Sequence, residues 1–94
     1  MQEKTIVKAI MQYLKALPDC FCFKCHGGMY GTAGLPHIIC CYRGRFVAFE
    51  VKVAKGKLTK LQETMLKRIN ATGGYAYKVT TLQEVKEILA NLNF

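Results

Sequence analysis

The first part of the chain carries apolar residues at the spacing of an amphipathic helix. Six of them recur at intervals of three or four residues: Ile6, Val7, Ile10, Met11, Leu14 and Leu17. This spacing places their side chains on one face of a helix, which can pack against a core. The pattern predicts a helix from residue 3 to residue 17. Pro18-Asp19 ends it, because the residue before a proline avoids helical backbone angles.

Glu3 belongs to the same face of that predicted helix. It precedes Val7 by four residues and Ile10 by seven, so it lies at the N-terminal edge of the apolar stripe. One interpretation is an acidic residue in the first turn, where the helix dipole favours a negative charge. The other is a carboxylate directed inward at a functional site, and the position alone leaves both open.

The pattern then changes to that of β-strands. Residues 20–25 and 37–42 are rich in Cys, Phe, Ile and Tyr, and residues 46–53 are mainly apolar, so each segment is predicted to be a strand. Arg43-Gly44-Arg45 is a turn signal that makes the second and third strands an antiparallel hairpin. Residues 26–34 contain four glycines and are predicted to be a flexible loop.

The third predicted strand carries the first sign of a function. It is apolar on both faces, which is typical of a central, buried strand. Glu50 and Lys52 nevertheless project from the same face, because side chains alternate with a period of two. Buried charges need a partner or a metal ion. In the hairpin, His37 should lie across from the end of this strand, next to Glu50 and Lys52.

A second helix is predicted after a basic loop. Thr59 and Gln62 have the spacing of a capping box, and Gly73-Gly74 stops the helix after about residue 72. Four side chains are expected to face inward from it: Leu61, Met65, Leu66 and Ile69.

The chain is predicted to end with a strand and a helix. Residues 75–79 form the strand, and a right-handed parallel crossover connects it to the third strand. Thr81 and Glu84 have the spacing of a second capping box, which opens the last helix. Its expected apolar side consists of Leu82, Val85, Ile88, Leu89 and Leu92. The element order αβββαβα predicts an α/β fold with a mixed four-stranded sheet flanked by helices.

Length and charge narrow the class of protein. Ninety-four residues make a single domain. No apolar run is long enough to span a membrane, and the first ten residues lack a signal-peptide pattern, so we expect a cytoplasmic protein. The net charge of +8 favours an anionic partner, and nucleic acid is the first candidate.

The cysteines allow more than one interpretation. There are five of them: Cys20, Cys22, Cys25, Cys40 and Cys41. An odd number without a secretion signal argues against a disulfide framework. Cys22 and Cys25 with His26 match the C-x-x-C-H pattern of haem attachment, or they could bind zinc together with a cysteine of the next strand. We favour buried core thiols, since Cys20 and Cys22 alternate with phenylalanines as strand residues do.

Three segments together resemble the VRR-NUC family of the PD-(D/E)XK nuclease superfamily. They are Gly34-Leu-Pro36-His37, then Glu50-Val-Lys52 after twelve intervening residues, and Gly56-Lys57-Leu-Thr-Lys-Leu-Gln62. The resemblance covers nearly the whole chain and implies one nuclease domain over residues 1–94 with a restriction-endonuclease-like core. Stand-alone members of this kind occur in phages and prophages, which suggests a bacterial host cell.

The resemblance also implies the chemistry. It implies a metal-dependent endonuclease that hydrolyses phosphodiester bonds in branched or structured DNA, with Mg²⁺ or Mn²⁺. Glu50 would be a metal ligand and catalytic residue, with the Val51 carbonyl beside it. Lys52 would orient or deprotonate the attacking water. Glu3 would be a further ligand from the first helix, and Gln62 would bind a water at the site or serve only as a cap.

One position departs from the family pattern. His37 stands where the family has an aspartate. A neutral imidazole can bind a divalent ion but brings no negative charge, and it favours softer ions such as Mn²⁺ over Mg²⁺. We expect an active nuclease with an altered metal preference. The alternative is a basic module with a degenerate nuclease site that binds DNA without cutting it.

The expected DNA contacts are basic residues that flank the proposed site in sequence. They are Lys24, Arg43, Arg45, Lys55, Lys57 and Lys60. Such residues contact phosphates and position the protein without identifying bases. Stand-alone relatives resemble Holliday junction resolvases, so the resemblance further implies a homodimer whose two sites act on two strands.

Overall fold

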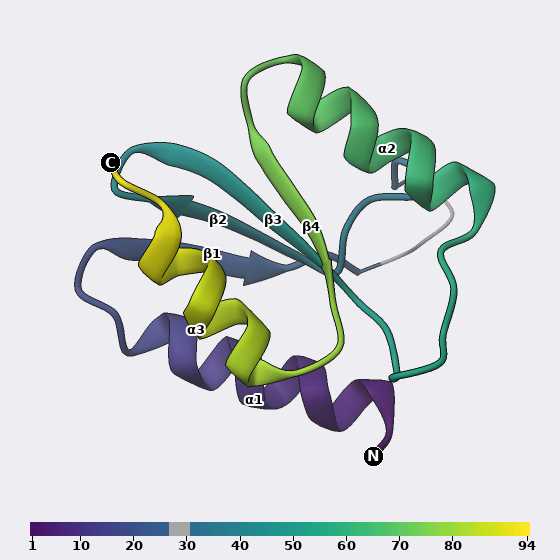
Figure 1. Ribbon diagram of the computed structural model, residues 1–94, viewed down its shortest axis with the longest axis horizontal. Coiled ribbons are helices and arrows are strands. Elements are labelled where there is room, and N and C mark those ends of the chain that lie inside the picture. Colours follow the sequence, from purple (N-terminus) through teal and green to yellow (C-terminus); the bar gives the residue numbers. More distant parts are fainter. Residues whose placement is uncertain (27–30) are drawn as a thin grey trace.

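The computed structural model describes residues 1–26 and 31–94, and the part of the loop at 27–30 lies outside the described residues. Figure 1 shows the seven elements, and the order αβββαβα is confirmed. They are α1 (Glu3–Lys15), β1 (Cys20–Lys24), β2 (Ile38–Tyr42), β3 (Arg45–Val51), α2 (Lys60–Ala71), β4 (Tyr75–Val79) and α3 (Leu82–Asn91). Within the described residues, no helix is both long and apolar enough to cross a membrane.

The four strands form one mixed sheet in the order β1-β2-β3-β4. β1 and β2 are antiparallel, as are β2 and β3, whereas β3 and β4 are parallel and joined through α2. The predicted hairpin and the parallel crossover are therefore confirmed. Ile38 pairs with Phe49, so His37, one residue earlier, lies next to Glu50, one residue later, as the hairpin predicted.

One face of the sheet packs against α1 and α3 (Figure 1). This face and the two helices contribute the main core of buried residues: Ile6, Val7, Ile10, Leu14, Cys22, Ile38, Cys40, Tyr42, Val47, Phe49, Val51, Val79, Val85 and Leu89. Because β3 contributes Val47, Phe49 and Val51 to this core, it is a central, buried strand as predicted.

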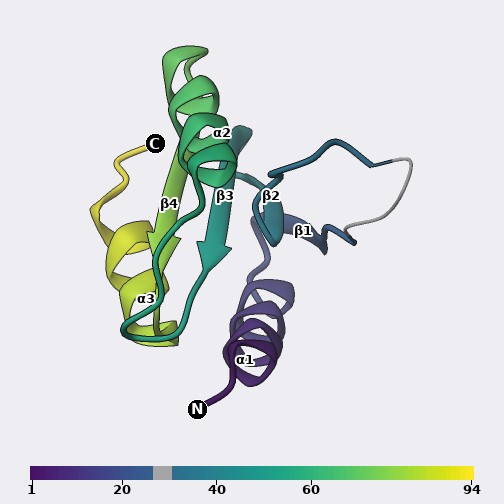
Figure 2. The ribbon, with the colours of Figure 1, turned by 90° about the vertical axis from the view of Figure 1, so that its right-hand side faces the viewer.

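The other face of the sheet is only partly covered. Figure 2 shows α2 beside β3 and β4 and away from β1. A small cluster under α2 contains Ile39, Ala48, Leu66 and Ala76. Phe46, at the start of β3, is 47% exposed and Phe21 on β1 is 70% exposed. The burial expected for both faces of the third strand is therefore wrong at Phe46, since α2 ends short of it.

The helix ends differ from the prediction in small ways. α1 ends at Lys15, two residues earlier than expected. α2 begins with the predicted capping box, in which Thr59 and Gln62 each donate a backbone N–H to the other's side-chain oxygen, at 3.0 and 3.1 Å. At α3, the Glu84 N–H donates to Thr81 Oγ1, but the Glu84 carboxylate accepts from the Thr80 N–H. The second predicted box is therefore only half formed.

The cysteines occupy different environments, and all five are free thiols. Cys22 and Cys40 are buried in the main core, where they are direct partners across β1 and β2. Cys25 instead packs against the cluster under α2. Burial raises the pKa of Cys20 to about 11, as expected of an inert core thiol. No three His, Cys, Asp or Glu residues of the described segments are grouped to hold a metal ion.

Asn70 ties the end of α2 to the start of β4. Its amide donates to the carbonyls of Leu66 at 3.0 Å and Ala76 at 3.1 Å, and its Oδ1 accepts from the Ala76 N–H at 3.0 Å. Asn70→Ala should lower the free energy of unfolding by about 1–3 kcal/mol, because it leaves buried backbone groups of β4 without partners. Urea denaturation measures this loss. Asn93→Ala, an exposed residue, should change it by less than about 0.5 kcal/mol.

Candidate active site

Glu50 is the buried charge around which the candidate site is built. It lies near the C-terminal end of β3 and is 1% exposed. Its side chain shares the α2 side of the sheet with Ala48, because residues two apart on a strand face the same way. A buried carboxylate is stable only with hydrogen-bond or charge partners. The partners found in the structure come from His37.

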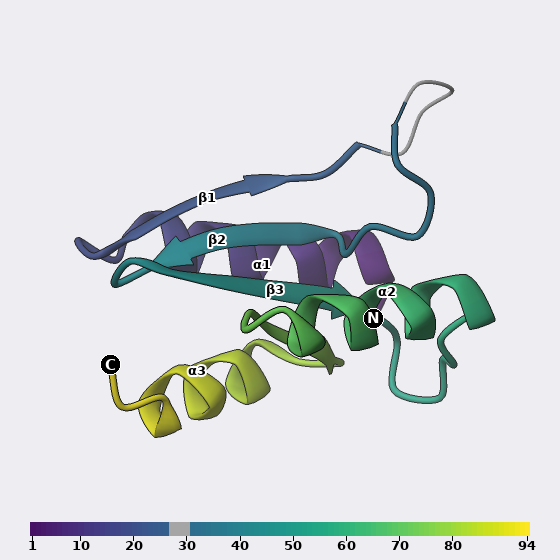
Figure 3. The same cartoon turned by 90° about the horizontal axis from the view of Figure 1, so that it is seen from above.

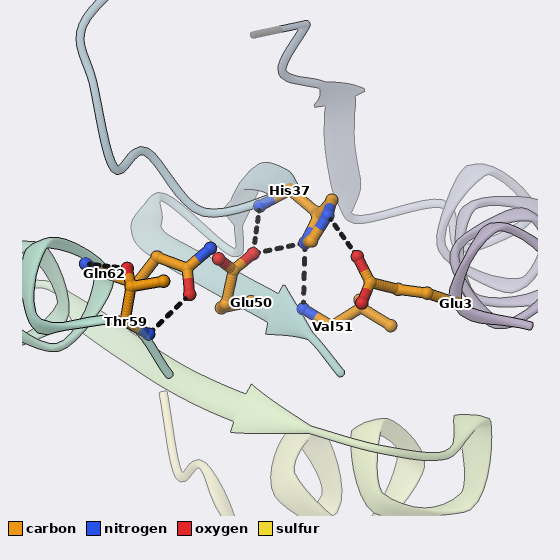
Figure 4. A network of polar contacts seen from close by, with 6 residues as sticks. All are labelled: Glu3, His37, Glu50, Val51, Thr59 and Gln62. Atoms are coloured by element: carbon orange, nitrogen blue, oxygen red, sulfur yellow. Dashed lines mark hydrogen bonds and ion pairs between the residues drawn. The ribbon is translucent and has the colours of Figure 1, made fainter. Parts of the chain in front are cut away.

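His37 contacts Glu50 through its backbone and its ring (Figure 4). Its N–H donates to Glu50 Oε1 at 3.2 Å, and its Nδ1 is in close contact with the same oxygen. The Val51 N–H also donates to Nδ1 at 3.1 Å. A single ring nitrogen cannot donate and accept at once. A protonated Nδ1 therefore donates to Glu50, whereas an unprotonated Nδ1 accepts from Val51.

Glu3 completes a chain of three side chains. Its Oε1 lies 3.0 Å from His37 Nε2, and Figure 4 shows the imidazole between the two carboxylates. The first turn of α1 thus directs Glu3 at His37, as the inward interpretation of that residue predicted. The hydrogen bond to Glu50 is the main cause that raises the pKa of His37, with burial opposing it. The negative charge of Glu3 raises it further.

These three side chains form a line and do not surround a common point. The two nitrogens of one imidazole point in different directions, and each meets a different carboxylate. Two carboxylates and one imidazole are donors that suit a divalent ion such as Mn²⁺. In the observed arrangement, however, His37 fills the space between Glu3 and Glu50. An ion could reach both carboxylates only if His37 turned away from them.

Lys52 follows the end of β3 directly. Its N–H donates to the Val79 carbonyl at 3.0 Å, which fixes the backbone beside β4. Its positive charge lowers the pKa of His37, so the ammonium group acts within electrostatic range of the imidazole. Lys52 is half-buried, and its role toward a water and a phosphate stays a prediction.

Gln62 caps α2 and also lines the cavity at Glu50. Its Oε1 is used by the capping box of α2, where it accepts from the Thr59 N–H. In Figure 4 the rest of its amide group is turned toward the Glu50 carboxylate. The capping function is confirmed, and the position beside Glu50 keeps the amide nitrogen available to the site.

A cavity of about 380 Å³ opens onto Glu50. Its walls include His26, His37, Gln62 and the loop segment 31–35. Gly34 holds this loop against α2, because it has a φ of +78° and a Cβ there would lie 2.8 Å from Leu61 Cγ. Leu61 is 51% exposed, so its predicted inward position is wrong. It lies beside the loop at Gly34 instead of in the core.

Comparisons with known proteins bear on the architecture. No family model matches the sequence, and no curated protein matches it. A solved structure described as a VRR_NUC domain superposes with a TM-score of 0.80 at 20% sequence identity, covering 97% of both chains. The chain has the fold of a VRR_NUC domain. The fold expected from the three sequence segments is thereby confirmed over nearly the whole length.

On this VRR_NUC fold, the predicted DNA contacts fall into two groups. Lys55 and Lys57 are exposed in the loop that follows Lys52, and Lys60 is exposed at the start of α2. Lys24 lines a groove that also contains His37. The contact of these four residues with DNA stays a prediction.

Arg43 and Arg45 lie elsewhere. They form the turn at the far end of the β2–β3 hairpin, about 20 Å from His37 at roughly 3.3 Å per strand residue. Arg43 Nε donates to Asp19 at 2.6 Å, and the Arg45 guanidinium lies 4.6 Å from the centre of the Phe94 ring. These two arginines flank the site in sequence but are separated from it in space by the length of a strand, and their contact with DNA stays a prediction.

Lys78 is a residue that sequence reasoning missed. It is the direct partner of Glu50 in the parallel β3–β4 pair, so its side chain leaves the sheet on the same face. It is exposed and places a positive charge on the sheet face that carries Glu50. Only the register of the parallel β3–β4 pair places Lys78 next to Glu50. That register cannot be predicted from two strand segments that are connected by a helix.

Proposed function

We propose that this protein is a metal-dependent DNA endonuclease that hydrolyses phosphodiester bonds in branched or structured DNA. The observation that carries the proposal is the contact of His37 with both Glu3 and Glu50, beside a cavity at His37 and Glu50 of a VRR_NUC fold. Helix α1, the residue before β2 and strand β3 each bring one of these side chains. A buried Glu50 is costly for folding, and a catalytic use accounts for that cost.

The residues around the cavity suit phosphodiester hydrolysis. Glu3 and Glu50 would hold a divalent ion, which would neutralise phosphoryl oxygens and activate a water. Lys52 would stabilise the negative charge that develops on the phosphate and orient the water. The Val51 N–H faces His37, and its carbonyl faces the same side of the strand, so it is available as the backbone ligand that we predicted.

His37 determines which ion the site prefers. To bind a metal it must release at least one of its carboxylate contacts, and it then offers an imidazole nitrogen in place of a carboxylate oxygen. Replacing an oxygen ligand with a nitrogen ligand weakens the binding of Mg²⁺, which prefers oxygen ligands, more than the binding of Mn²⁺. We therefore propose an enzyme that is more active with Mn²⁺ than with Mg²⁺.

A second candidate function rests on the same residue. Because His37 contacts both carboxylates, a protonated imidazole offsets part of their negative charge without an added ion. This favours a basic module that binds DNA without cutting it. Binding to DNA would then depend on the net charge of +8 and fall steeply with salt.

Cleavage of labelled DNA separates the two candidates. The protein is incubated with branched and linear duplexes in Mg²⁺, in Mn²⁺ and with a chelator. The nuclease proposal predicts cutting with Mn²⁺, weaker cutting with Mg²⁺ and none with the chelator. Binding in all three conditions without cutting in any of them would exclude the enzyme and leave the binding module.

Lys52→Ala should separate catalysis from binding. We expect cutting to fall by roughly 100-fold or more, the effect typical of a lost proton-transfer or charge-stabilising group, while DNA affinity changes little. Single-turnover cleavage and fluorescence anisotropy measure the two quantities. Lys67→Ala removes the same charge from an exposed position on α2 and should leave the cleavage rate within about twofold. Equal effects of both substitutions would show that Lys52 acts only as a surface charge.

We also propose that the protein acts as a homodimer. A domain of 94 residues has little surface to hold branched DNA, and a twofold pair of sites would act on two strands. Light scattering after size exclusion gives the mass directly. A monomer at the concentrations used for cleavage would contradict this part of the proposal without affecting the site itself.

A further inference from the structure

A second hollow runs alongside α1 and joins the candidate site. It has a volume of about 930 Å³ and lies between the outer side of α1 and the free edge of β1. Figures 1 and 3 show α1 running along this edge strand. We call it the α1–β1 groove. Cys25, His26 and His37 line both the groove and the cavity at Glu50, so the two spaces adjoin at these residues.

The groove is strongly basic. Lys4, Lys8 and Lys15 line one wall, and at 100° per residue they lie within about 40° of one another on α1 and span about 16 Å. Lys24 lines the opposite wall. None of the four forms an ion pair with a residue that the structure describes. The one acidic residue in the groove, Glu3, is held by His37.

The floor of the groove is apolar and its rim is aromatic. Val7 and Met11 contribute to the floor. Phe23 lines the groove at the edge of β1 and is 48% exposed, and its side chain leaves the sheet on the face opposite Cys22. Phe21 lies next to Phe23, with 6.3 Å between ring centres, but it does not line the groove. A basic channel with an exposed aromatic ring is the usual composition of sites for single-stranded nucleic acid, whose bases stack on the ring.

The free edge of β1 supplies further polar groups. The Cys25 N–H donates to the His37 carbonyl. Because the direction of backbone groups alternates along a strand, the N–H and C=O of Cys22 and Lys24 point away from β2, toward the groove. An added peptide strand could also use this edge. A second copy of this basic chain would place lysines against lysines there, which disfavours the groove as a dimer interface.

We propose that the α1–β1 groove binds a single-stranded DNA segment and leads it to Glu50. The lysines contact phosphates, and Phe23 stacks on an unpaired base. A base pair in a duplex offers no such free face, so the groove selects DNA that carries a single-stranded arm. This inference rests on the proposed function, because it names the substrate class for that site.

Binding is tested without cleavage, using Glu50→Gln as the background and a chelator throughout. The probe is a labelled oligothymidylate of about twelve nucleotides, within the usual site size of small domains, and a blunt duplex is the comparison. Fluorescence anisotropy gives the affinity of each. We expect Lys8→Ala/Lys15→Ala to weaken oligothymidylate binding at least tenfold and to reduce the salt slope by about 1.4, or about 0.7 per lost phosphate contact.

The control is Lys67→Ala/Arg68→Ala, which removes the same charge from exposed positions on α2. It should weaken binding by less than about twofold. Phe23→Ala should weaken oligothymidylate binding at least fivefold and duplex binding by less than twofold, as expected for a lost stacking contact. Phe21→Ala, at the neighbouring exposed ring outside the groove, should have a much smaller effect.

Several results would overturn the proposal. Equal losses in the groove variant and the α2 control would show that only net charge matters. Equal losses of single strand and duplex would mean that the groove does not select single strands. If Phe23→Ala instead changed the mass in light scattering and left DNA affinity intact, this surface would be an interface between copies. If the protein bound single-stranded DNA in the groove as expected but cut no DNA, the groove proposal would be supported and the nuclease proposal would be rejected.

Discussion

Glu50→Gln should abolish DNA cutting while the fold persists. Glutamine has almost the same shape as glutamate. Its side-chain oxygen can accept the hydrogen bond that the His37 N–H donates to Glu50 Oε1, at 3.2 Å, in the original protein. The substitution removes the one negative charge that is buried within residues 1–26 and 31–94, where Glu50 is 1% exposed. The cleavage rate should fall by roughly 100-fold or more, the loss typical of a preorganised charged group.

Stability gives the second readout for this substitution. Burying a charge is expensive, so the neutral glutamine should leave the free energy of unfolding within about 1 kcal/mol of the original protein. Thermal unfolding and cleavage are measured on the same preparation. Glu63→Gln, at an exposed carboxylate on α2, is the control and should alter neither. Unchanged cutting by Glu50→Gln would remove Glu50 from the mechanism and the nuclease proposal with it.

The sequence predicts the part of the site that local geometry determines. The hairpin is short, and its turn fixes the register, so the pairing of Ile38 with Phe49 and hence the meeting of His37 with Glu50 could be expected in advance. The Thr59–Gln62 cap follows from spacing in the same way. In each case, the interacting residues belong to one element or to two elements joined by a tight turn.

The remaining features depend on how distant elements are placed. The helical period puts Glu3 on the inner face of α1, but it does not specify that Glu3 meets Nε2 of His37 at 3.0 Å. The parallel β3–β4 register that brings Lys78 beside Glu50 depends on the length of the connection through α2. The α1–β1 groove likewise arises only when the lysine side of α1 is set against an edge strand.

The same distinction explains the wrong expectations. Leu61 and Phe46 fit the apolar pattern of their elements, yet both are about half exposed. Phe46 is exposed because α2 covers only the part of the sheet face near β3 and β4. Leu61 is exposed because the first turn of α2 lies against Gly34. Apolar periodicity identifies the side of an element that can be buried. How far the covering element extends decides which of those positions are buried.

His37→Asp should convert the site to one that uses Mg²⁺. Aspartate is shorter and cannot contact Glu3 and Glu50 at once as the imidazole does. It would leave three carboxylates around one opening, which repel one another without a cation and offer the oxygen ligands that Mg²⁺ prefers. We expect Mg²⁺-supported cutting that exceeds that of the original protein by tenfold or more.

Metal binding by this variant can be measured independently of activity. Because an ion that binds only the folded protein adds RT ln(1 + [L]/Kd) to its stability, saturating Mg²⁺ should stabilise His37→Asp by about 2–3 kcal/mol. His26→Asp is the matched control, since it makes the same change in the same cavity at a residue without a carboxylate contact. It should gain neither Mg²⁺ stabilisation nor cutting. If His37→Asp also gained neither, Glu3 and Glu50 would not be metal ligands, and DNA binding without cleavage would be the function that the site supports.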